Sequence, residues 1–407
     1  MIKRRIYEDL WKKLSSYGKM VFLSGPRQCG KTTFANDTAK SFVNSVYFNW
    51  DRLSDKKRFA ANNAFFQEVD RKDASAPLVI LDEIHKYKKW KNYLKGVYDE
   101  FSNDYCFLIT GSGRLDISHK GGDALSGRYM QMSMFPFTVS ELSKPAADIE
   151  TFIKNPLKNA TPDTNSLTMP LWKQLFTYGG FPEPFIKQDK DFLNIWSDGY
   201  LKQIVRDDIR SVMELKNADS MEFLVSLLPS KIGSPLSMNN IAQDLNVSFD
   251  TVKNWLKILD SFYITFSLSP WSSKISRSIL KSKKYYLFNY TEINDESLRF
   301  ENMAALDLYG ALTRWRQSGK GDYRLFYIRN KEKEEVDFLI TRDNVPKVLV
   351  EAKLNDTEPS RSLTYFQKIL KIPAVQLVNK DGIYRLIKND FGGQLIVSAH
   401  LWLASLP

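Results

Sequence analysis

The chain has 407 residues, of which 43% are hydrophobic and 26% are charged, and its 58 Lys and Arg against 47 Asp and Glu residues give a formal net charge of +11. At about 150 residues per domain, this length predicts two to three domains, and the composition excludes a wholly disordered chain. Two cysteines and three histidines exclude a Cys/His zinc finger and a disulfide scaffold.

The charged N-terminal segment has no apolar stretch behind it, and the chain contains no apolar run of the ~18 residues that a membrane helix needs. We therefore expect a cytoplasmic protein without a membrane partner. The positive charge is compatible with an anionic partner such as nucleic acid but does not require one, because many soluble proteins are basic.

Short apolar runs alternate with helical patterns through the first ~140 residues, as is typical of a parallel sheet covered on both faces. The five candidate strands are Val21–Leu23, Val46–Phe48, Leu78–Leu81, Cys106–Ile109 and Tyr129–Met134. We assign residues 1–142 to this α/β core.

A phosphate-binding loop follows the first candidate strand. The segment fits G-x-x-x-x-G-K-[ST] at every fixed position, and a helical pattern begins at Thr33 directly after it. Glycines let backbone N–H groups surround the phosphates, the lysine should reach the β- and γ-phosphates, and the threonine hydroxyl should bind Mg²⁺. The loop residues are Gly25, Pro26, Arg27, Gln28, Cys29, Gly30, Lys31 and Thr32. This motif predicts ATP or GTP as the ligand.

Two carboxylates end the third candidate strand, where the ligands of open α/β sheets lie. Asp82 would hold Mg²⁺ through water, and Glu83 would polarise the attacking water, so we expect hydrolysis as well as binding. Ser112, after the next strand, could orient that water through its hydroxyl or its backbone amide. Arg128 is either an arginine finger or sensor, which contributes ~10³–10⁵ in rate where measured, or a surface arginine; Arg114 is a weaker candidate for the same role.

A resemblance emerges from six motifs taken in order: Gly25–Thr32, Leu81–Glu83, Ile109–Ser112, Ser126–Arg128, Phe135–Phe137 and Gly179–Pro182. This order resembles a family of prokaryotic AAA-type ATPases whose C-terminal domain of unknown function looks like a nuclease fold. The resemblance implies that the nucleotide is ATP and favours a phosphate-sensing role for Arg128. An arginine finger that acts on a neighbouring chain would require a homo-oligomer.

The middle of the chain divides at a polar, proline-interrupted stretch. Ser143–Pro170 is typical of a linker, and the helical pattern of Leu171–Leu215 is interrupted at Gly179–Pro182, so we assign residues 143–217 to a linker and helical lid.

Residues 218–290 are expected to form a winged-helix domain. Met238–Leu245 and Ser248–Phe262 predict a helix–turn–helix, and Tyr263–Leu268 and Lys284–Asn289 predict two strands. The segment Trp271–Tyr285 carries five positive charges and no acid. Either the second helix enters a DNA groove with a basic wing on the phosphates, or the domain is a spacer or protein-contact module with a solvated loop. The basic positions of the wing are Lys274, Arg277, Lys281, Lys283 and Lys284.

The last part, residues 291–407, brings hard oxygen ligands together on a predicted hairpin. Glu351 and Lys353 alternate along one strand, so both should point to one face, and Asp337 lies on the adjacent strand. Carboxylates suit Mg²⁺ or Mn²⁺, and a lysine beside them could position the water that attacks a phosphodiester. The pattern resembles the PD-(D/E)xK nuclease superfamily, which implies that Glu301 reaches the same metal site. For Arg329, a phosphate contact and a salt bridge to the carboxylates are equally compatible with the pattern.

The sequence thus predicts an α/β protein with a P-loop AAA-type ATPase core, a helical lid, a winged-helix domain and a C-terminal restriction-endonuclease-like α/β domain. The leading hypothesis is an ATPase whose nucleotide state governs a Mg²⁺-dependent nuclease acting on DNA, with RNA less favoured. The alternative is an ATP-dependent switch that binds DNA or protein without cleaving it. A third hypothesis is an ATP-driven assembly protein of the cell surface or of defence.

Overall fold

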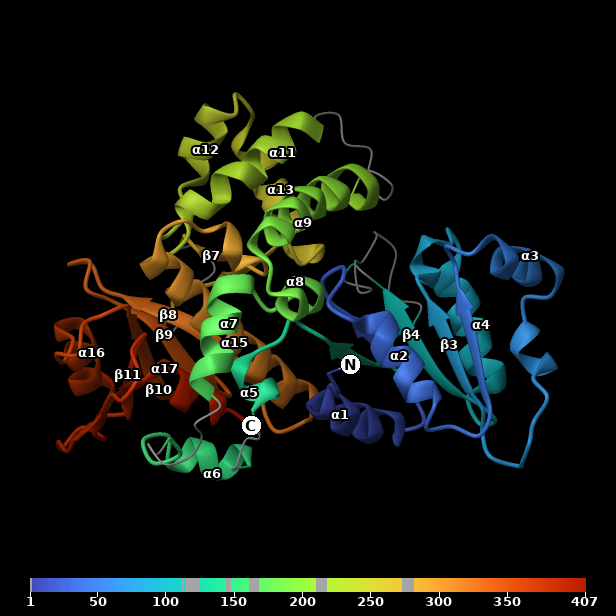
Figure 1. Ribbon diagram of the computed structural model, residues 1–407, viewed down its shortest axis with the longest axis horizontal. Helices are drawn as coiled ribbons and strands as arrows, with labels where there is room; N and C mark the ends of the chain where they lie inside the picture. Colours follow the sequence, from blue (N-terminus) through green and yellow to red (C-terminus); the bar gives the residue numbers. More distant parts are fainter. Residues whose placement is uncertain are drawn as a thin grey trace. The chain divides into compact units, whose positions relative to one another are not determined.

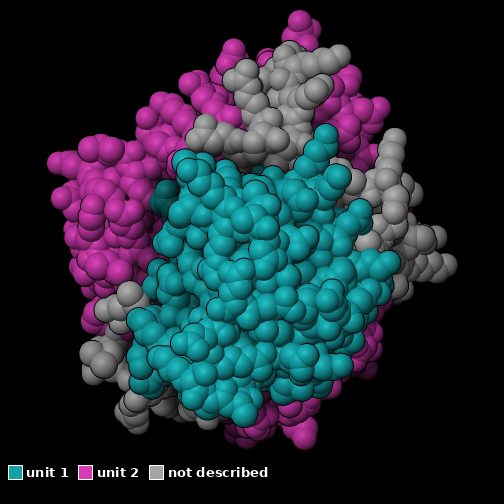
Figure 2. Space-filling view, turned by 90° about the vertical axis from the view of Figure 1, so that its right-hand side faces the viewer, with its two compact units in different colours: residues 1–135, 261–263 teal, residues 136–260, 264–407 magenta. Residues whose placement is uncertain are grey.

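The computed structural model describes residues 2–111, 113, 125–143, 148–160, 168–209, 218–272 and 282–407. It divides into two compact units, residues 1–135 with 261–263 and residues 136–260 with 264–407 (Figure 2). The finer division into four domains at residues 142, 217 and 290 stays a prediction.

The first unit contains a five-stranded sheet in which every pair of neighbours is parallel (Figure 1). The strand order is β2-β3-β4-β1-β5, and each strand begins within one residue of the run that predicted it. The expected α/β core with a parallel sheet is therefore confirmed. The strands are β1 (Met20–Ser24), β2 (Ser45–Asn49), β3 (Leu78–Asp82), β4 (Cys106–Gly111) and β5 (Tyr129–Ser133).

Helices cover both faces of this sheet because successive strand residues point to opposite sides. Val21 and Leu23 pack in one apolar core with the buried faces of α1 and α2, whereas Phe22 packs in the other with that of α4. The helices of this unit are α1 (Arg5–Ser15), α2 (Lys31–Ala39), α3 (Leu53–Ala61) and α4 (Trp90–Phe101), with 3-10 helices η1 (Phe65–Glu68) and η2 (Ile84–Lys86).

The second unit begins with helices, one of which corrects the predicted linker. Ser143–Pro170 was expected to lack secondary structure, yet it contains α6 and the start of α7. Asp148 caps α6 through the N–H groups of Glu150 and Thr151, and the fully buried Phe152 packs against the rings of Trp315 and Trp402. These tertiary contacts have no local signal in a polar, proline-rich sequence. The helices are α5 (Val139–Leu142), α6 (Ile149–Lys154), α7 (Thr168–Tyr178), α8 (Pro182–Lys187) and α9 (Lys190–Gln203), followed by the π-helical turn η4 (Ile204–Ile209).

The Gly179–Pro182 motif connects α7 to α8, and its backbone lies close to the backbone of Phe137. The Phe137 N–H donates a 2.6 Å hydrogen bond to the Gly180 carbonyl. A Cβ at Gly180 would lie 2.3 Å from the Phe137 carbonyl oxygen, so only glycine fits there. The two motifs that carried part of the family resemblance, Phe135–Phe137 and Gly179–Pro182, therefore meet in space.

The expected helix–turn–helix and its two strands are present, whereas the winged-helix interpretation stays a prediction. Ser248 caps α13 by accepting a 3.1 Å hydrogen bond from the Thr251 N–H, and the predicted stripe of Val252, Trp255, Leu256 and Leu259 is buried. β6 and β7 pair antiparallel. The elements are α11 (Ala218–Leu227), η5 (Leu228–Lys231), α12 (Met238–Asp244), α13 (Phe249–Ser261), β6 (Thr265–Leu268) and β7 (Lys284–Leu287).

The predicted basic wing is corrected at Lys284. This residue is completely buried on β7, so it is not part of a solvated loop. Lys274, Arg277 and Lys281 lie outside the described residues.

The C-terminal part of the second unit is a mixed six-stranded sheet in the order β12-β13-β11-β10-β9-β8. β8, β9 and β10 pair antiparallel, and β10, β11 and β13 pair parallel. α15 packs on β8 and β10, and α16 packs on β9, β10 and β11 (Figure 1). No described helix is both long enough and apolar enough to cross a bilayer. The elements are η6 (Tyr290–Glu292), α15 (Glu296–Gln317), β8 (Tyr323–Arg329), β9 (Glu335–Arg342), β10 (Val345–Lys353), α16 (Arg361–Leu370), β11 (Ala374–Val378), β12 (Tyr384–Ile387), β13 (Gln394–Ser398) and α17 (Ala399–Ala404).

A buried carboxyl group on α15 makes the stability of this unit depend on pH. Burial raises the pKa of Asp307 to about 8, against a 3.4 Å hydrogen bond from the Val139 N–H that lowers it. Between its ordinary value near 4 and about 8, the folded protein holds a proton that the unfolded chain has lost, so the free energy of unfolding falls as pH rises.

We predict that Asp307→Asn, which cannot ionise, makes this fall shallower between pH 5 and 8. The measurement is denaturant unfolding at several pH values. Asp295→Asn, which keeps a capping side chain at the start of α15, is the control and should follow the wild-type slope. An Asp307→Asn slope identical to that of the wild type would contradict the assignment.

Candidate functional site

The predicted phosphate-binding loop connects β1 to α2, with Gly30 as the N-cap of the helix. A Cβ at Gly25 would lie 2.0 Å from the Met134 carbonyl oxygen, so the start of the loop requires glycine. Gln28, Thr32 and Thr33 are exposed, whereas Cys29 is buried in the core beneath the loop. One side of the loop therefore packs on the apolar core, and the other side is open to solvent, as a phosphate-binding site requires.

Lys31 and Thr32 both make side-chain contacts at the predicted phosphate site. The Lys31 ammonium donates hydrogen bonds to the carbonyl oxygens of Gly25 (3.0 Å) and Pro26 (2.6 Å), so it lies folded over the loop. The Thr32 hydroxyl donates a 2.9 Å hydrogen bond to Asp82 Oδ2, which brings the two predicted Mg²⁺ ligands together. A hydroxyl beside a carboxylate is a donor set that suits hydrated Mg²⁺.

Neutral donors surround the Asp82 carboxylate, and no sequence motif identified them. Tyr47 donates a 2.6 Å hydrogen bond to Asp82 Oδ2, and the Thr110 hydroxyl donates to Oδ1. Burial raises the pKa of Tyr47, and the hydrogen bond to Asp82 raises it further. The phenol therefore stays protonated and acts as a hydrogen-bond donor. The pairing of β2 with β3 places Asn49 beside Asp82. The polar end of the predicted second strand was therefore the one feature of the sequence that could have indicated these partners.

Glu83 lies at the same edge of the sheet, directly after β3, in the left-handed conformation (φ 58°). Its backbone N–H donates to the Thr110 carbonyl (3.0 Å), and its carboxylate lies 3.4 Å from the Lys86 ammonium and 3.6 Å from His85 Nε2. Burial lowers the pKa of His85, which favours the neutral ring. Ser112 and Arg114 lie outside the described residues.

Two arginines of the first unit form side-chain contacts that bear on the predicted site. Arg128 precedes β5 and forms a two-point ion pair with Asp99 (2.7 and 3.1 Å). β1 and β5 are parallel with Met20 opposite Tyr129, so Arg128 lies at the edge of the sheet away from the loop after Ser24. Within one chain, the structure does not bring Arg128 to the phosphate site. Arg4, which the sequence did not single out, is buried and donates to the carbonyl oxygens of Cys29 (2.9 Å) and Phe135 (2.6 Å).

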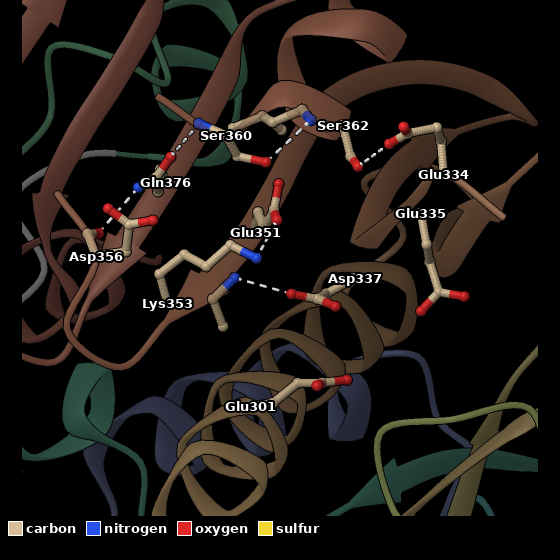
Figure 3. A network of polar contacts seen from close by, with 12 residues as sticks. Glu301, Glu334, Glu335, Asp337, Glu351, Lys353, Asp356, Ser360, Ser362 and Gln376 are labelled. Atoms are coloured by element: carbon tan, nitrogen blue, oxygen red, sulfur yellow. Dashed lines mark hydrogen bonds and ion pairs between the residues drawn. The ribbon is translucent and has the colours of Figure 1, made fainter. Parts of the chain in front are cut away.

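The predicted nuclease-like residues come together in the second unit (Figure 3). The register of β9 and β10 pairs Phe338 with Val350, the neighbours of Asp337 and Glu351 in the two strands. Asp337 Oδ2 accepts a 3.0 Å hydrogen bond from the Ala352 N–H. Lys353 lies 2.6 Å from Glu351 Oε1. Glu301 approaches from α15, as the resemblance implied.

Burial and mutual repulsion perturb the acids of this cluster. Burial raises the pKa of Glu301 to about 7, and repulsion by the Asp337 carboxylate contributes to this rise. The same two causes raise the pKa of Glu351. Burial alone would lower the pKa of Lys353, but the Glu351 carboxylate raises it overall. Glu351 Oε2 is buried and has no hydrogen-bond partner. Carboxylates forced together in this way favour a cation.

A protein cation already lies among these carboxylates. The Lys284 ammonium is 2.7 Å from Glu335 Oε1, 3.3 Å from Glu301 Oε1 and 3.5 Å from Asp337 Oδ1. Neither Lys284 nor Glu335 was assigned to this site from the sequence. Glu335 had a local signal, because it lies two residues before Asp337 on β9 and shares its face, whereas the approach of Lys284 depends on the tertiary fold. Within the described part of the chain, no group of three or more His, Cys, Asp or Glu side chains is arranged to hold a metal ion directly. The donors are of the right type for Mg²⁺ or Mn²⁺, but they are arranged around an ammonium.

Arg329 was compatible with either a phosphate contact or a salt bridge. Its Nη1 lies 3.1 Å from Glu335 Oε2, so it forms a salt bridge with a carboxylate of this cluster.

Three family models match successive parts of the chain. An AAA domain matches residues 17–143, and two domains of unknown function, DUF8612 and DUF4143, match residues 169–290 and 300–400. The second and third matches assign no activity, so the nuclease-like interpretation rests on the geometry alone.

Curated relatives are similar to this chain at low identity. The chain is 26% identical over 378 residues to an uncharacterized protein of Methanocaldococcus jannaschii, MJ1544, covering 89% of this chain and 81% of the relative. It is 23% identical over 287 residues to an uncharacterized protein of Mycobacterium tuberculosis, Rv2008c, covering 70% of this chain and 58% of that relative.

A solved structure, the Hsp104–ADP complex of S. cerevisiae, matches 79% of this chain and 44% of its own at 14% identity and a TM-score of 0.29, which is too low to support an argument. The AAA-domain match to residues 17–143 and the P-loop geometry together support nucleotide binding by this part of the chain.

Proposed function

We propose that the chain is a Mg²⁺-dependent ATPase whose nucleotide state governs a nuclease-like domain acting on DNA. The observation that carries the ATPase part is the 2.9 Å contact between the Thr32 hydroxyl and Asp82, which brings the P-loop and the end of β3 to one point. Mg²⁺, when bound there, neutralises phosphate charge during transfer.

The residues of the first unit have distinct roles in this proposal. Lys31 exchanges the carbonyl oxygens of Gly25 and Pro26 for phosphate oxygens, and Asp82 holds the ion with help from Tyr47. Glu83 orients the attacking water at the same edge. Arg128, already paired with Asp99 in its own chain, would act only on the nucleotide of a neighbouring chain in a homo-oligomer.

The observation that supports a nuclease-like site is the convergence of Asp337, Glu351 and Lys353 on one hairpin. A divalent ion, when bound, lowers the pKa of water and stabilises charge on a phosphodiester. Lys353 would position that water, and Glu301 would complete the set of oxygen ligands from α15. DNA is the proposed substrate, with RNA as an outcome of the test.

A second candidate function is an ATP-dependent switch that binds DNA without cutting it. The observation that favours it is Lys284, which occupies the position between Glu301, Glu335 and Asp337 that a cation would take. A buried ammonium supplies charge balance but cannot activate water in the way that a divalent ion does.

We predict that Lys31→Ala abolishes ATP binding and that Glu83→Gln retains binding but lowers turnover about 10²-fold or more, because the carboxylate acts only on the attacking water. The measurements are ATP titration and phosphate release. Lys40→Ala, at the exposed end of α2, should match the wild type. A Glu83→Gln variant that hydrolyses ATP at the wild-type rate would contradict the role of this carboxylate.

We further predict that the full chain with ATP and Mg²⁺ or Mn²⁺ degrades DNA, and that Asp337→Asn and Lys353→Ala each abolish this while ATP turnover continues. The assay compares linear, supercoiled and single-stranded DNA with RNA. Lys347→Ala, on the same strand as Lys353, is the matched control and should cleave normally. Absence of cleavage under every condition, together with binding that weakens steeply with salt, would favour the non-cleaving switch.

A further inference from the structure

Lys284 is the most completely enclosed charge of the carboxylate cluster. Its side chain is 1% exposed, and carboxylate oxygens of Glu301, Glu335 and Asp337 lie within 3.5 Å of its ammonium. The Tyr327 ring lies 5.6 Å from the same nitrogen. Burial alone would lower the pKa of Lys284, but Glu301, Asp337 and Glu335 raise it overall, so it remains a cation.

The strand that presents Lys284 also holds the cluster through a second side chain. Lys284 and Tyr286 are two residues apart on β7, so they point to the same face. The Tyr286 hydroxyl donates a 2.8 Å hydrogen bond to Glu301 Oε1, the oxygen that also contacts Lys284. On its other edge β7 is flanked by residues 235–236, because Pro235 bridges to Lys284 and the Leu236 N–H donates to the Lys283 carbonyl. A single strand therefore controls two of the contacts of Glu301.

The same oxygens cannot serve Lys284 and a divalent ion at once. Mg²⁺ and Mn²⁺ bind through direct contacts to carboxylate oxygens, and a positive charge that already contacts Glu301 and Asp337 repels a second one. Glu351 is paired with a different ammonium, because Lys353 lies 2.6 Å from its Oε1. Lys284 thus occupies the Glu301 and Asp337 side of the proposed site, and Lys353 contacts the Glu351 side.

We propose that Lys284 is the resident cation of this cluster and that a divalent ion binds to Glu301, Asp337 and Glu351 only when β7 withdraws the Lys284 ammonium. This inference rests on the proposed nuclease-like site and adds its regulation. β7 pairs with β6, and β6 directly follows the helix–turn–helix. The segment expected to contact DNA is therefore linked to the strand that determines whether a divalent ion can bind.

The proposal is tested by Lys284→Met, which keeps the length of the side chain and removes its charge. We expect Mn²⁺ to bind the full chain at least about tenfold more tightly than it binds the wild type, since no protein cation has to be displaced. Titration calorimetry without nucleic acid or nucleotide gives the affinity, and thermal unfolding should show a larger Mn²⁺-induced rise in midpoint for the variant. Lys283→Met, the adjacent lysine, is the control and should bind Mn²⁺ as the wild type does. Unchanged or weaker Mn²⁺ binding by Lys284→Met would overturn the proposal.

A measurement on the wild type covers the case in which Lys284→Met fails to fold. Acetylation of lysines followed by mass spectrometry should show Lys284 protected without metal and modified faster with saturating Mn²⁺. Equal protection in both conditions would overturn the proposal.

Two further variants separate this proposal from the proposed function. If Asp337→Asn and Glu351→Gln weaken Mn²⁺ binding while Lys284→Met leaves it unchanged, the metal site stands and the role of Lys284 fails. If neither acid variant affects Mn²⁺ binding, the nuclease-like site itself fails.

Discussion

Compensation of partly buried carboxylates by a buried lysine is the interaction on which the C-terminal part of the chain depends. Glu301, Glu335 and Asp337 come from α15 and β9, and each would be costly to bury as an unpaired charge. Lys284 connects them to β7, and Tyr286 reinforces that connection through Glu301. Removing one partner of such a set leaves the others uncompensated, so the set holds these elements in one arrangement.

The two acidic sites of the chain solve the same problem in different ways. Asp82 is buried at the end of β3, but its partners are the neutral hydroxyls of Thr32, Tyr47 and Thr110. Hydroxyl groups can exchange a carboxylate for water or a metal ion at little electrostatic cost. Lys284, in contrast, carries the charge that a metal ion would bring. At the proposed nucleotide site the Asp82 charge is therefore not compensated by any of these three partners, whereas the carboxylate cluster is arranged around a cation of the protein.

Local pattern was sufficient to predict the ATPase core. Continuous apolar runs located all five strands of its sheet, and the P-loop and Asp82 fell where strand ends in a parallel sheet converge. The hairpin carrying Asp337 and Glu351 followed from alternation and spacing in the same way. Contacts between distant segments had no such signal. The pattern placed Lys284 among five charges of a basic loop, because its burial depends on acids of another strand. Phe152 lies in a stretch whose prolines indicated a linker, because its burial depends on a tryptophan more than a hundred residues away.

Arg128 illustrates how register can limit a motif. The family resemblance favoured a phosphate-sensing role, yet the parallel pairing of β1 with β5 puts Arg128 at the end of the strands opposite to the P-loop. The proposed function of the C-terminal part depends most on which cation occupies the carboxylate cluster. A crystal structure of the full chain grown with Mn²⁺, with an anomalous map, tests this directly. The account predicts a Mn²⁺ peak bonded to Asp337 and Glu351 and a Lys284 ammonium that has left Glu301. A map without a peak, in which Lys284 still contacts all three acids at saturating Mn²⁺, would contradict it.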